Sequence, residues 1–225
     1  MTTNACTFNN QVGRDDLSLG IVVAENIEIA KPNPVLEERL RQLLEQRRQP
    51  LTAEEEKIRA AGRDLLRNGS YKPTGRGKPA AEYLLREGME NQFPRVNTAV
   101  DIINYISLKY LVSISVWDID LAQSRQFVFR LGKAGESYVF NQTGQVIALE
   151  SLVTGFAMVA GQEIPIVTPV KDSLNTKTTG QSKNVAVAIY YPKTAGSRGH
   201  LNQMLQECGE LLAIITTNTP WQQIV

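Results

Sequence analysis

Hydrophobic residues recur with a helical spacing in the first half of the chain and in short β-type runs in the second. Residues 19–29 are rich in β-branched side chains and predict a strand. Apolar positions then repeat at close to 3.6 residues and predict four helices, over residues 35–48, 52–67, 79–89 and 98–110. The short connection at residues 49–51 predicts that the first two helices form an antiparallel pair.

Capping residues support these helix limits. Asn33 and Pro34 supply an N-cap and a first-turn proline, and Pro50 ends the first helix. Thr52 and Glu55 have the spacing of a capping box, in which each side chain satisfies a free backbone N–H. Residues 70–79 contain two Gly and two Pro and predict a loop.

The second half predicts strands followed by one helix. β-rich segments separated by Gly and Asn turns occupy residues 114–117, 127–131, 138–140, 146–149, 156–159, 164–167 and 185–191. A helix is expected over residues 201–215 and a closing strand over 221–225. This order favours an α+β fold with a β-sandwich-like core and flanking helices. We expect an N-terminal arm over residues 1–18 and a single domain over 19–225.

Composition excludes several kinds of chemistry. The chain has 225 residues, 42% hydrophobic and 21% charged, which is typical of a globular protein with a core. Two cysteines and one histidine, His200, predict neither a disulfide framework nor a metal site, and no cofactor is implied. The polar start of the chain and the absence of a long apolar run predict a cytoplasmic protein with no membrane contact.

Positive charge is concentrated although the net charge is only +1. Residues 57–80 hold seven Lys or Arg against one Asp, and residues 171–198 hold five against one. Arg59, Arg63 and Arg67 are spaced to form one helical stripe, followed in the loop by Tyr71, Arg76 and Lys78. These six residues are candidates for RNA binding through phosphate contacts and base stacking. The alternative interpretation is an ordinary solvated helix face and loop.

Residues 95–121 carry a spaced pattern that includes Val100-Asp101, Asn104-Tyr105, Leu108, Asp118 and Asp120. The pattern resembles a segment of the beta subunit of bacterial phenylalanyl-tRNA synthetase. Asp172-Ser173, residues 176–178 and residues 183–185 are similar to a run found in free-standing proteins built from this domain alone. In the synthetase the domain edits and binds tRNA, hydrolysing tyrosine mischarged on the phenylalanine tRNA. The resemblance implies the fold of that editing domain and no aminoacylating activity.

The resemblance also implies a substrate pocket. Asn104 matches a pocket Asn, and Ser115 stands where the family has a His. Thr168 falls near an Ala-Gly pair that walls the pocket, and Ala188 falls near the Glu that reads the tyrosine hydroxyl. We therefore expect Asn104, Ser115, Thr168 and Ala188 to line one cleft that is less polar than a tyrosine site. Little activity on tyrosyl-tRNA is expected, and no residue is assigned as catalytic.

Three functions are consistent with these observations. The leading hypothesis is a free-standing tRNA-binding protein that hydrolyses mischarged aminoacyl-tRNA in trans, with tRNA and an aminoacyl group as its partners. A second is a small-molecule or amino-acid binding protein without catalysis. A third is an accessory subunit that works through an unidentified protein partner. Hydrolysis needs no protein nucleophile if a water molecule is correctly oriented, so the absence of a triad leaves all three open.

Overall fold

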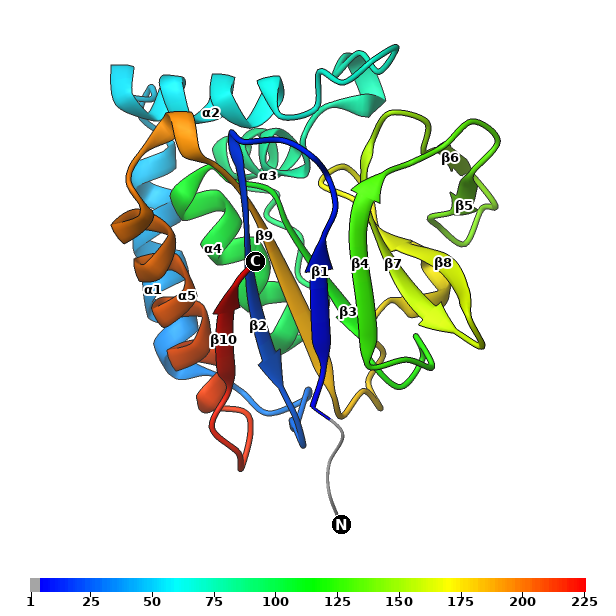
Figure 1. The fold of residues 1–225 in the computed structure, drawn as a ribbon. Coiled ribbons are helices and arrows are strands. Elements are labelled where there is room, and N and C mark those ends of the chain that lie inside the picture. Colours follow the sequence, from blue (N-terminus) through cyan, green and yellow to red (C-terminus); the bar gives the residue numbers. More distant parts are fainter. Residues whose placement is uncertain (1–4) are drawn as a thin grey trace.

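Two four-stranded sheets face each other in the computed structural model, which describes residues 5–225 (Figure 1). The first sheet has the order β1–β4–β7–β8, formed by Thr7–Asn10, Gln126–Leu131, Val153–Val159 and Gln162–Val167. The second has the order β10–β2–β9–β3, formed by Trp221–Ile224, Leu17–Ala24, Val185–Pro192 and Ile114–Asp118. Strand β1 pairs with β4 in parallel, and the other pairs within the two sheets are antiparallel.

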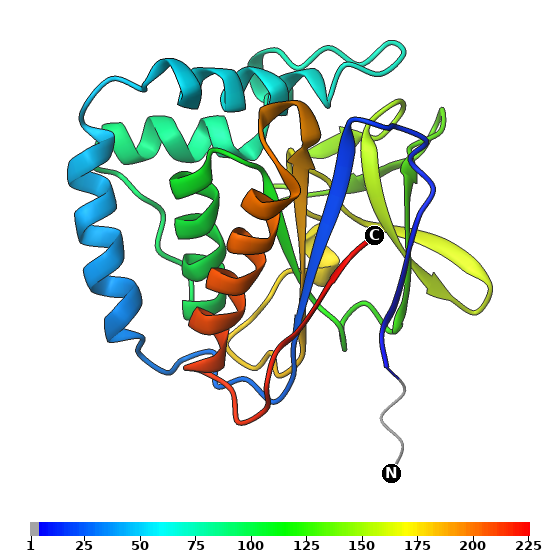
Figure 2. The same cartoon turned by 60° about the vertical axis from the view of Figure 1, so that its left-hand side comes forward.

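Helices cover the outer face of the second sheet. They are α1 (Pro34–Arg47), α2 (Ala53–Asp64), α3 (Ala80–Met89), α4 (Thr98–Tyr110) and α5 (Arg198–Ala213). Figure 2 shows these helices on one side of the second sheet and the first sheet on its other side. Short 3₁₀ turns occupy Gly75–Gly77, Leu174–Thr176 and Lys193–Ala195, and a hairpin is formed by β5 (Ser137–Val139) and β6 (Val146–Ala148). Within the described residues, no helix is both long and apolar enough to cross a membrane.

Alternation along β9 separates two cores. Val187 and Ile189 pack with the helices, whereas Ala188 and Tyr190 pack with the first sheet. Because successive side chains of a strand point to opposite faces, one fully buried strand serves both cores. The aromatic centre of the inter-sheet core is Trp117, which contacts the rings of Phe8, Phe127 and Phe129. The predicted α+β fold with a sandwich-like core and flanking helices is confirmed.

Two predictions about local arrangement differ from the structure. Helices α1 and α2 cross instead of lying antiparallel side by side (Figure 2), because α1 packs on α3 and α4 while α2 packs across β9. Arg47 fixes the corner by bonding the carbonyls of Leu108 and Lys109 and the Glu55 carboxylate. The residues expected to form an arm include strand β1, which was not predicted. The strand predicted over residues 19–29 is β2, which begins at Leu17 and ends at Ala24.

Candidate functional site

Three of the four predicted pocket residues lie together between the sheets. Ser115 on β3 is the register partner of Ala188 on β9. The Ser115 hydroxyl lies 3.1 Å from the carbonyl oxygen of Thr168, which follows β8. All three are at most 2% exposed, so their side chains fill the interior. A neighbouring cavity lined by Ser113, Pro169 and Tyr190 has about 10 Å³ of space, roughly the size that holds one water molecule.

Asn104 lies on the other side of the second sheet. It belongs to α4, whose buried residues pack with Val187 and Ile189 on the outer face of β9. Ser115 and Ala188 point from the opposite face. The expected convergence of Asn104 with Ser115 and Ala188 in one cleft is therefore wrong, because the sheet separates them.

Asp172, which the sequence indicated only as the start of a matching run, also belongs to this region. The Ser115 hydroxyl donates to Asp172 Oδ1 at 2.7 Å and lies 3.1 Å from the hydroxyl of Tyr190. The Thr168 hydroxyl donates to the Lys171 carbonyl at 2.8 Å and accepts from the Lys171 N–H, which closes the loop that carries Asp172. We call Ser115, Asp172 and Tyr190, with the backbone of Thr168, the polar cluster.

The environment of Asp172 perturbs its protonation. Burial raises the pKa of the Asp172 carboxyl from 3.8 to about 7, against the opposing effects of the Ser115 hydrogen bond and the Lys177 charge. Burial also raises the pKa of Tyr190 well above its ordinary value. A carboxyl group that titrates near neutrality can accept and return a proton at physiological pH. The Ser115 hydroxyl thus has a carboxylate partner, while His200 lies beside Tyr191 at the start of α5.

The arginine stripe of α2 is neutralised by carboxylates. Arg63 forms a bidentate pair with Glu82 of α3, whose side chain is 9% exposed. Arg59 pairs with Glu56 and lies 3.7 Å from the same Glu82, and Arg67 pairs with Asp64. The charges of this stripe are thus already paired within the protein, which favours a structural role for it.

The loop after α2 keeps its cations exposed. Arg76 and Lys78 are exposed, and no carboxylate in residues 5–225 pairs with either. Tyr71 is partly exposed, its ring packs against a buried cluster, and its hydroxyl donates to the Gly77 carbonyl at 3.0 Å. Burial raises the pKa of Tyr71 to about 12.

A second set of cations adjoins this loop. Lys177 is exposed and donates to the Phe140 carbonyl at 2.7 Å, and the Lys171 ammonium lies 4.6 Å from the centre of the Phe140 ring. Burial, together with the charges of Lys177 and Arg76, lowers the pKa of Lys171. The two loops are joined where the Ala80 N–H donates to the Pro169 carbonyl at 2.9 Å. We call Arg76, Lys78, Lys171 and Lys177 the cationic surface.

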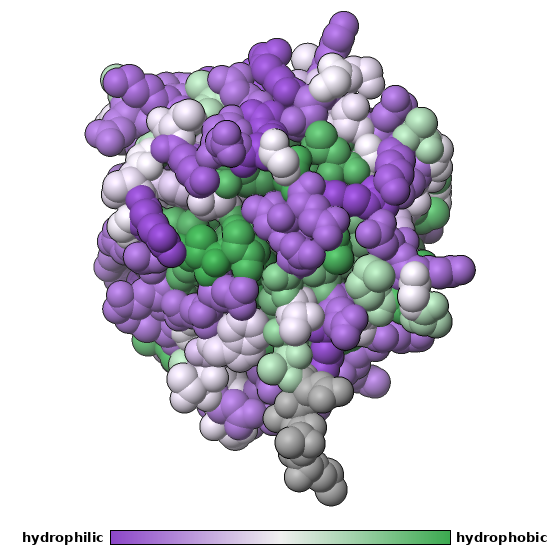
Figure 3. Space-filling view, viewed as in Figure 1, coloured by the Kyte–Doolittle hydropathy of each residue, from purple (hydrophilic) through white to green (hydrophobic). Residues whose placement is uncertain are grey.

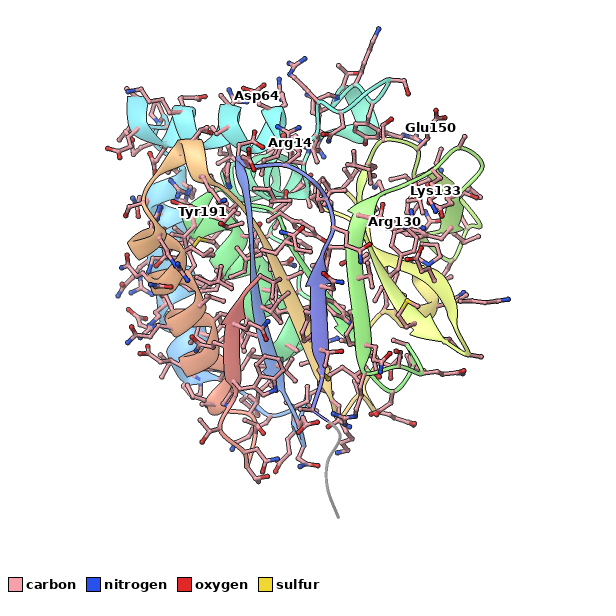
Figure 4. The ribbon with its side chains drawn as sticks, viewed as in Figure 1. Arg14, Asp64, Arg130, Lys133, Glu150 and Tyr191 are labelled. Carbon is pink, nitrogen blue, oxygen red and sulfur yellow. The ribbon has the colours of Figure 1, made fainter. Side chains whose placement is uncertain are left out.

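Two arginine side chains hold the segments beside these loops. Arg14 bonds the carbonyls of Leu65 and Arg67 and the Asn68 side chain, at the end of α2 near Asp64 (Figure 4). On the opposite side, Arg130 pairs with Glu136 and Glu163 and lies 3.7 Å from the centre of the Phe156 ring. The Arg14 contacts anchor the start of the basic loop, residues 70–79. The Arg130 contacts anchor the start of the β5–β6 hairpin that carries Phe140.

Other candidates have structural roles or lie elsewhere. Asp118 accepts from the Leu121 N–H at 2.9 Å, and Asp120 accepts from the Asn184 side chain, so both hold turns. Figure 3 shows an apolar patch over the region of α5 and β10. A groove of about 490 Å³ in this region is lined by residues that include Leu17, Leu201 and Ile224.

Comparison with known families finds one match. A family model described as the B3/4 domain matches residues 74–204, more than half of the chain. These limits include Arg76 and Lys78, the polar cluster and the first seven residues of α5. No curated protein sequence matches the chain.

Proposed function

Because the chain belongs to the B3/4 domain family, a domain found in the beta subunit of phenylalanyl-tRNA synthetase, we propose that it binds tRNA through the cationic surface. The observation that carries this proposal is the contrast in charge pairing. The arginines of α2 are matched by Glu56, Asp64 and Glu82, whereas Arg76, Lys78 and Lys177 have no carboxylate partner in the described chain.

Unpaired cations held together favour an anionic ligand. Lys177 and Arg76 lie close enough to Lys171 to lower its pKa, so these positive charges repel one another. A phosphate group placed among them would relieve that repulsion, and counterion release would add to the affinity. The Tyr71–Gly77 hydrogen bond and the Arg14 contacts with the end of α2 support the loop that presents Arg76. Little ordering entropy would therefore be lost on binding.

The finer activity we propose is hydrolysis of mischarged aminoacyl-tRNA in trans, without aminoacylation. Ser115, Thr168 and Ala188 fill the interior, so the aminoacyl side chain would have to lie outside the inter-sheet core, against the loops. Asp172, the partly exposed member of the polar cluster beside Lys171 and Lys177, is where we propose that the ester lies. The alternative is binding without catalysis, as in an accessory subunit.

The salt dependence of tRNA affinity tests the binding proposal. Replacing Arg76, Lys78 and Lys177 together by Gln removes three proposed phosphate contacts. The slope of log affinity against log salt should then become shallower by about 2.1–2.7, at roughly 0.7–0.9 per contact. Fluorescence anisotropy with labelled tRNA between 50 and 200 mM salt measures this slope.

A matched triple variant controls for net charge. Lys31, Arg41 and Arg48 are exposed and belong to α1 or the residues beside it, away from the two loops. Replacing them by Gln lowers the charge equally and should leave the slope within about 0.5 of the wild-type value. Equal effects of the two triple variants, or a wild-type slope near zero, would remove the cationic surface as a tRNA site.

A further inference from the structure

Asp172 is the outermost member of the polar cluster. Ser115 and Tyr190 are 1% and 3% exposed, whereas Asp172 keeps part of its surface accessible although its carboxyl group is surrounded by protein atoms. The Ser115 hydroxyl at 2.7 Å orients Oδ1 of the carboxyl group. Asp172 is thus positioned from behind by Ser115, and it is the member of the polar cluster nearest to solvent.

The neighbours of Asp172 belong to the proposed RNA surface. Lys171 precedes it in the chain, and the charge of Lys177 acts on its carboxyl group. A nucleic-acid phosphate held by Lys171, Lys177 and Arg76 would therefore bring the RNA close to this carboxylate. We propose that Asp172 is the catalytic base that activates water to hydrolyse the aminoacyl ester of a bound tRNA, an inference that rests on the proposed function.

The reaction needs water as its only co-reactant. The water oxygen attacks the ester carbonyl carbon while one of its protons passes to the Asp172 carboxylate. The bond between that carbon and the ribose oxygen then breaks, and the ribose oxygen takes the proton back from the Asp172 carboxyl. The products are the free amino acid and uncharged tRNA, and no group is oxidised or reduced. Ser115 acts as a positioning residue because it holds Oδ1 and does not touch the ester.

Substitution of Asp172 is the main test. Deacylation is followed in single-turnover experiments on a panel of tRNAs that each carry a non-cognate amino acid. Asp172→Asn should reduce the rate by about 10²–10⁴-fold, the usual contribution of a general base, and leave the salt slope of tRNA binding unchanged. Asp15→Asn, at an exposed aspartate of another loop, is the matched control and should keep the wild-type rate.

The pH profile tests the geometry. Lys177, Tyr138 and Tyr190 are the other titratable groups that face Asp172, and the pKa of each Tyr is raised well above 10. The wild-type rate should therefore rise through about pH 7 as Asp172 alone loses its proton. Because the Ser115 hydrogen bond lowers the Asp172 pKa, Ser115→Ala should move this rise to higher pH. A purely structural role for Ser115 would leave the midpoint in place.

The outcomes separate the two proposals. A wild-type protein that deacylates a member of the panel, with an Asp172→Asn variant within about threefold of it, overturns the assignment of Asp172 and leaves the proposed function intact. A wild-type protein inactive on the whole panel overturns hydrolysis itself, and the salt-slope experiment still decides tRNA binding. Circular dichroism of each variant, and the carboxylate-bearing Asp172→Glu variant, separate loss of chemistry from loss of the fold.

Discussion

Asp172 should lower the stability of the fold at neutral pH. Its pKa is raised from 3.8 to about 7 by burial, so the folded state holds its proton more tightly than the unfolded chain does. The stabilisation from this proton is complete below the unfolded pKa and is lost as the pH rises through about 7. Ionisation of Asp172 in the folded protein thus costs about 4 kcal/mol, at 1.36 kcal/mol for each pKa unit.

Asp172→Asn removes this titration and should make the fold relatively more stable as the pH rises. The quantity to follow is the free energy of unfolding of the variant minus that of the wild type. Linkage between the folded and unfolded pKa values of Asp172 predicts that this difference increases by about 2.5 kcal/mol between pH 5 and pH 8. Urea denaturation followed by circular dichroism at pH 5, 6, 7 and 8 measures the difference directly.

Taking the difference cancels the other titrating groups, which are common to both proteins. Several carboxylates with lowered pKa values, such as Glu136 and Asp16, titrate below this range and act in the opposite direction. A difference that increases with pH is therefore diagnostic of a carboxyl group with a raised pKa. A difference that stays constant within about 0.5 kcal/mol from pH 5 to pH 8 would refute the claim that Asp172 is buried at a desolvation cost.

Two further predictions concern ionic contacts away from the polar cluster. Arg63→Gln should leave tRNA affinity and its salt slope unchanged, but should destabilise the fold by about 1 kcal/mol because the nearly buried Glu82 loses its bidentate partner, as thermal and urea unfolding can measure. Glu207→Gln should destabilise by about 1–3 kcal/mol at pH 7, because Glu207 accepts from Lys109, Tyr105 and Tyr110. Burial alone would raise the Glu207 pKa, but these donors lower it, so the loss should shrink in unfolding experiments as the pH falls below about 4. A salt slope that follows Arg63, or a Glu207 effect that grows in acid, would contradict these assignments.

Local signals predicted the helices, and non-local pairing limited the rest. The capping box of Thr52 and Glu55 is present with both of its hydrogen bonds, and Asn33 accepts from the Leu36 N–H as its N-cap position predicts. Strand β1 has only four residues and forms by parallel pairing with β4, more than a hundred residues later in the chain. Short segments whose pairing partner is distant carry little periodic signal of their own.

The site depended even more on distant contacts. The partner of Ser115 is Asp172, 57 residues away, and the partner of Arg63 is Glu82, 19 residues away on the next helix. The sequence indicated a basic stripe and a run beginning at Asp172, but it could not show which cations are paired. The sequence also could not show that Asn104 and Ser115 are separated. Helix α4, which carries Asn104, packs on the outer face of the sheet, whereas the Ser115 side chain points from the inner face.

The polar cluster and the cationic surface share one energetic property. Several arginines elsewhere are paired within the protein, as Arg130 is with Glu136 and Glu163. At the two joined loops Arg76 and Lys177 form no ion pair among the described residues, and Asp172 lies where burial makes its ionisation unfavourable. Selection for stability alone would favour an amide at position 172, because an amide has no cost of ionisation in a buried position. Two unfavourable features side by side, one that favours an anion and one that favours proton transfer, are expected where a phosphate and a reactive bond have to be held together.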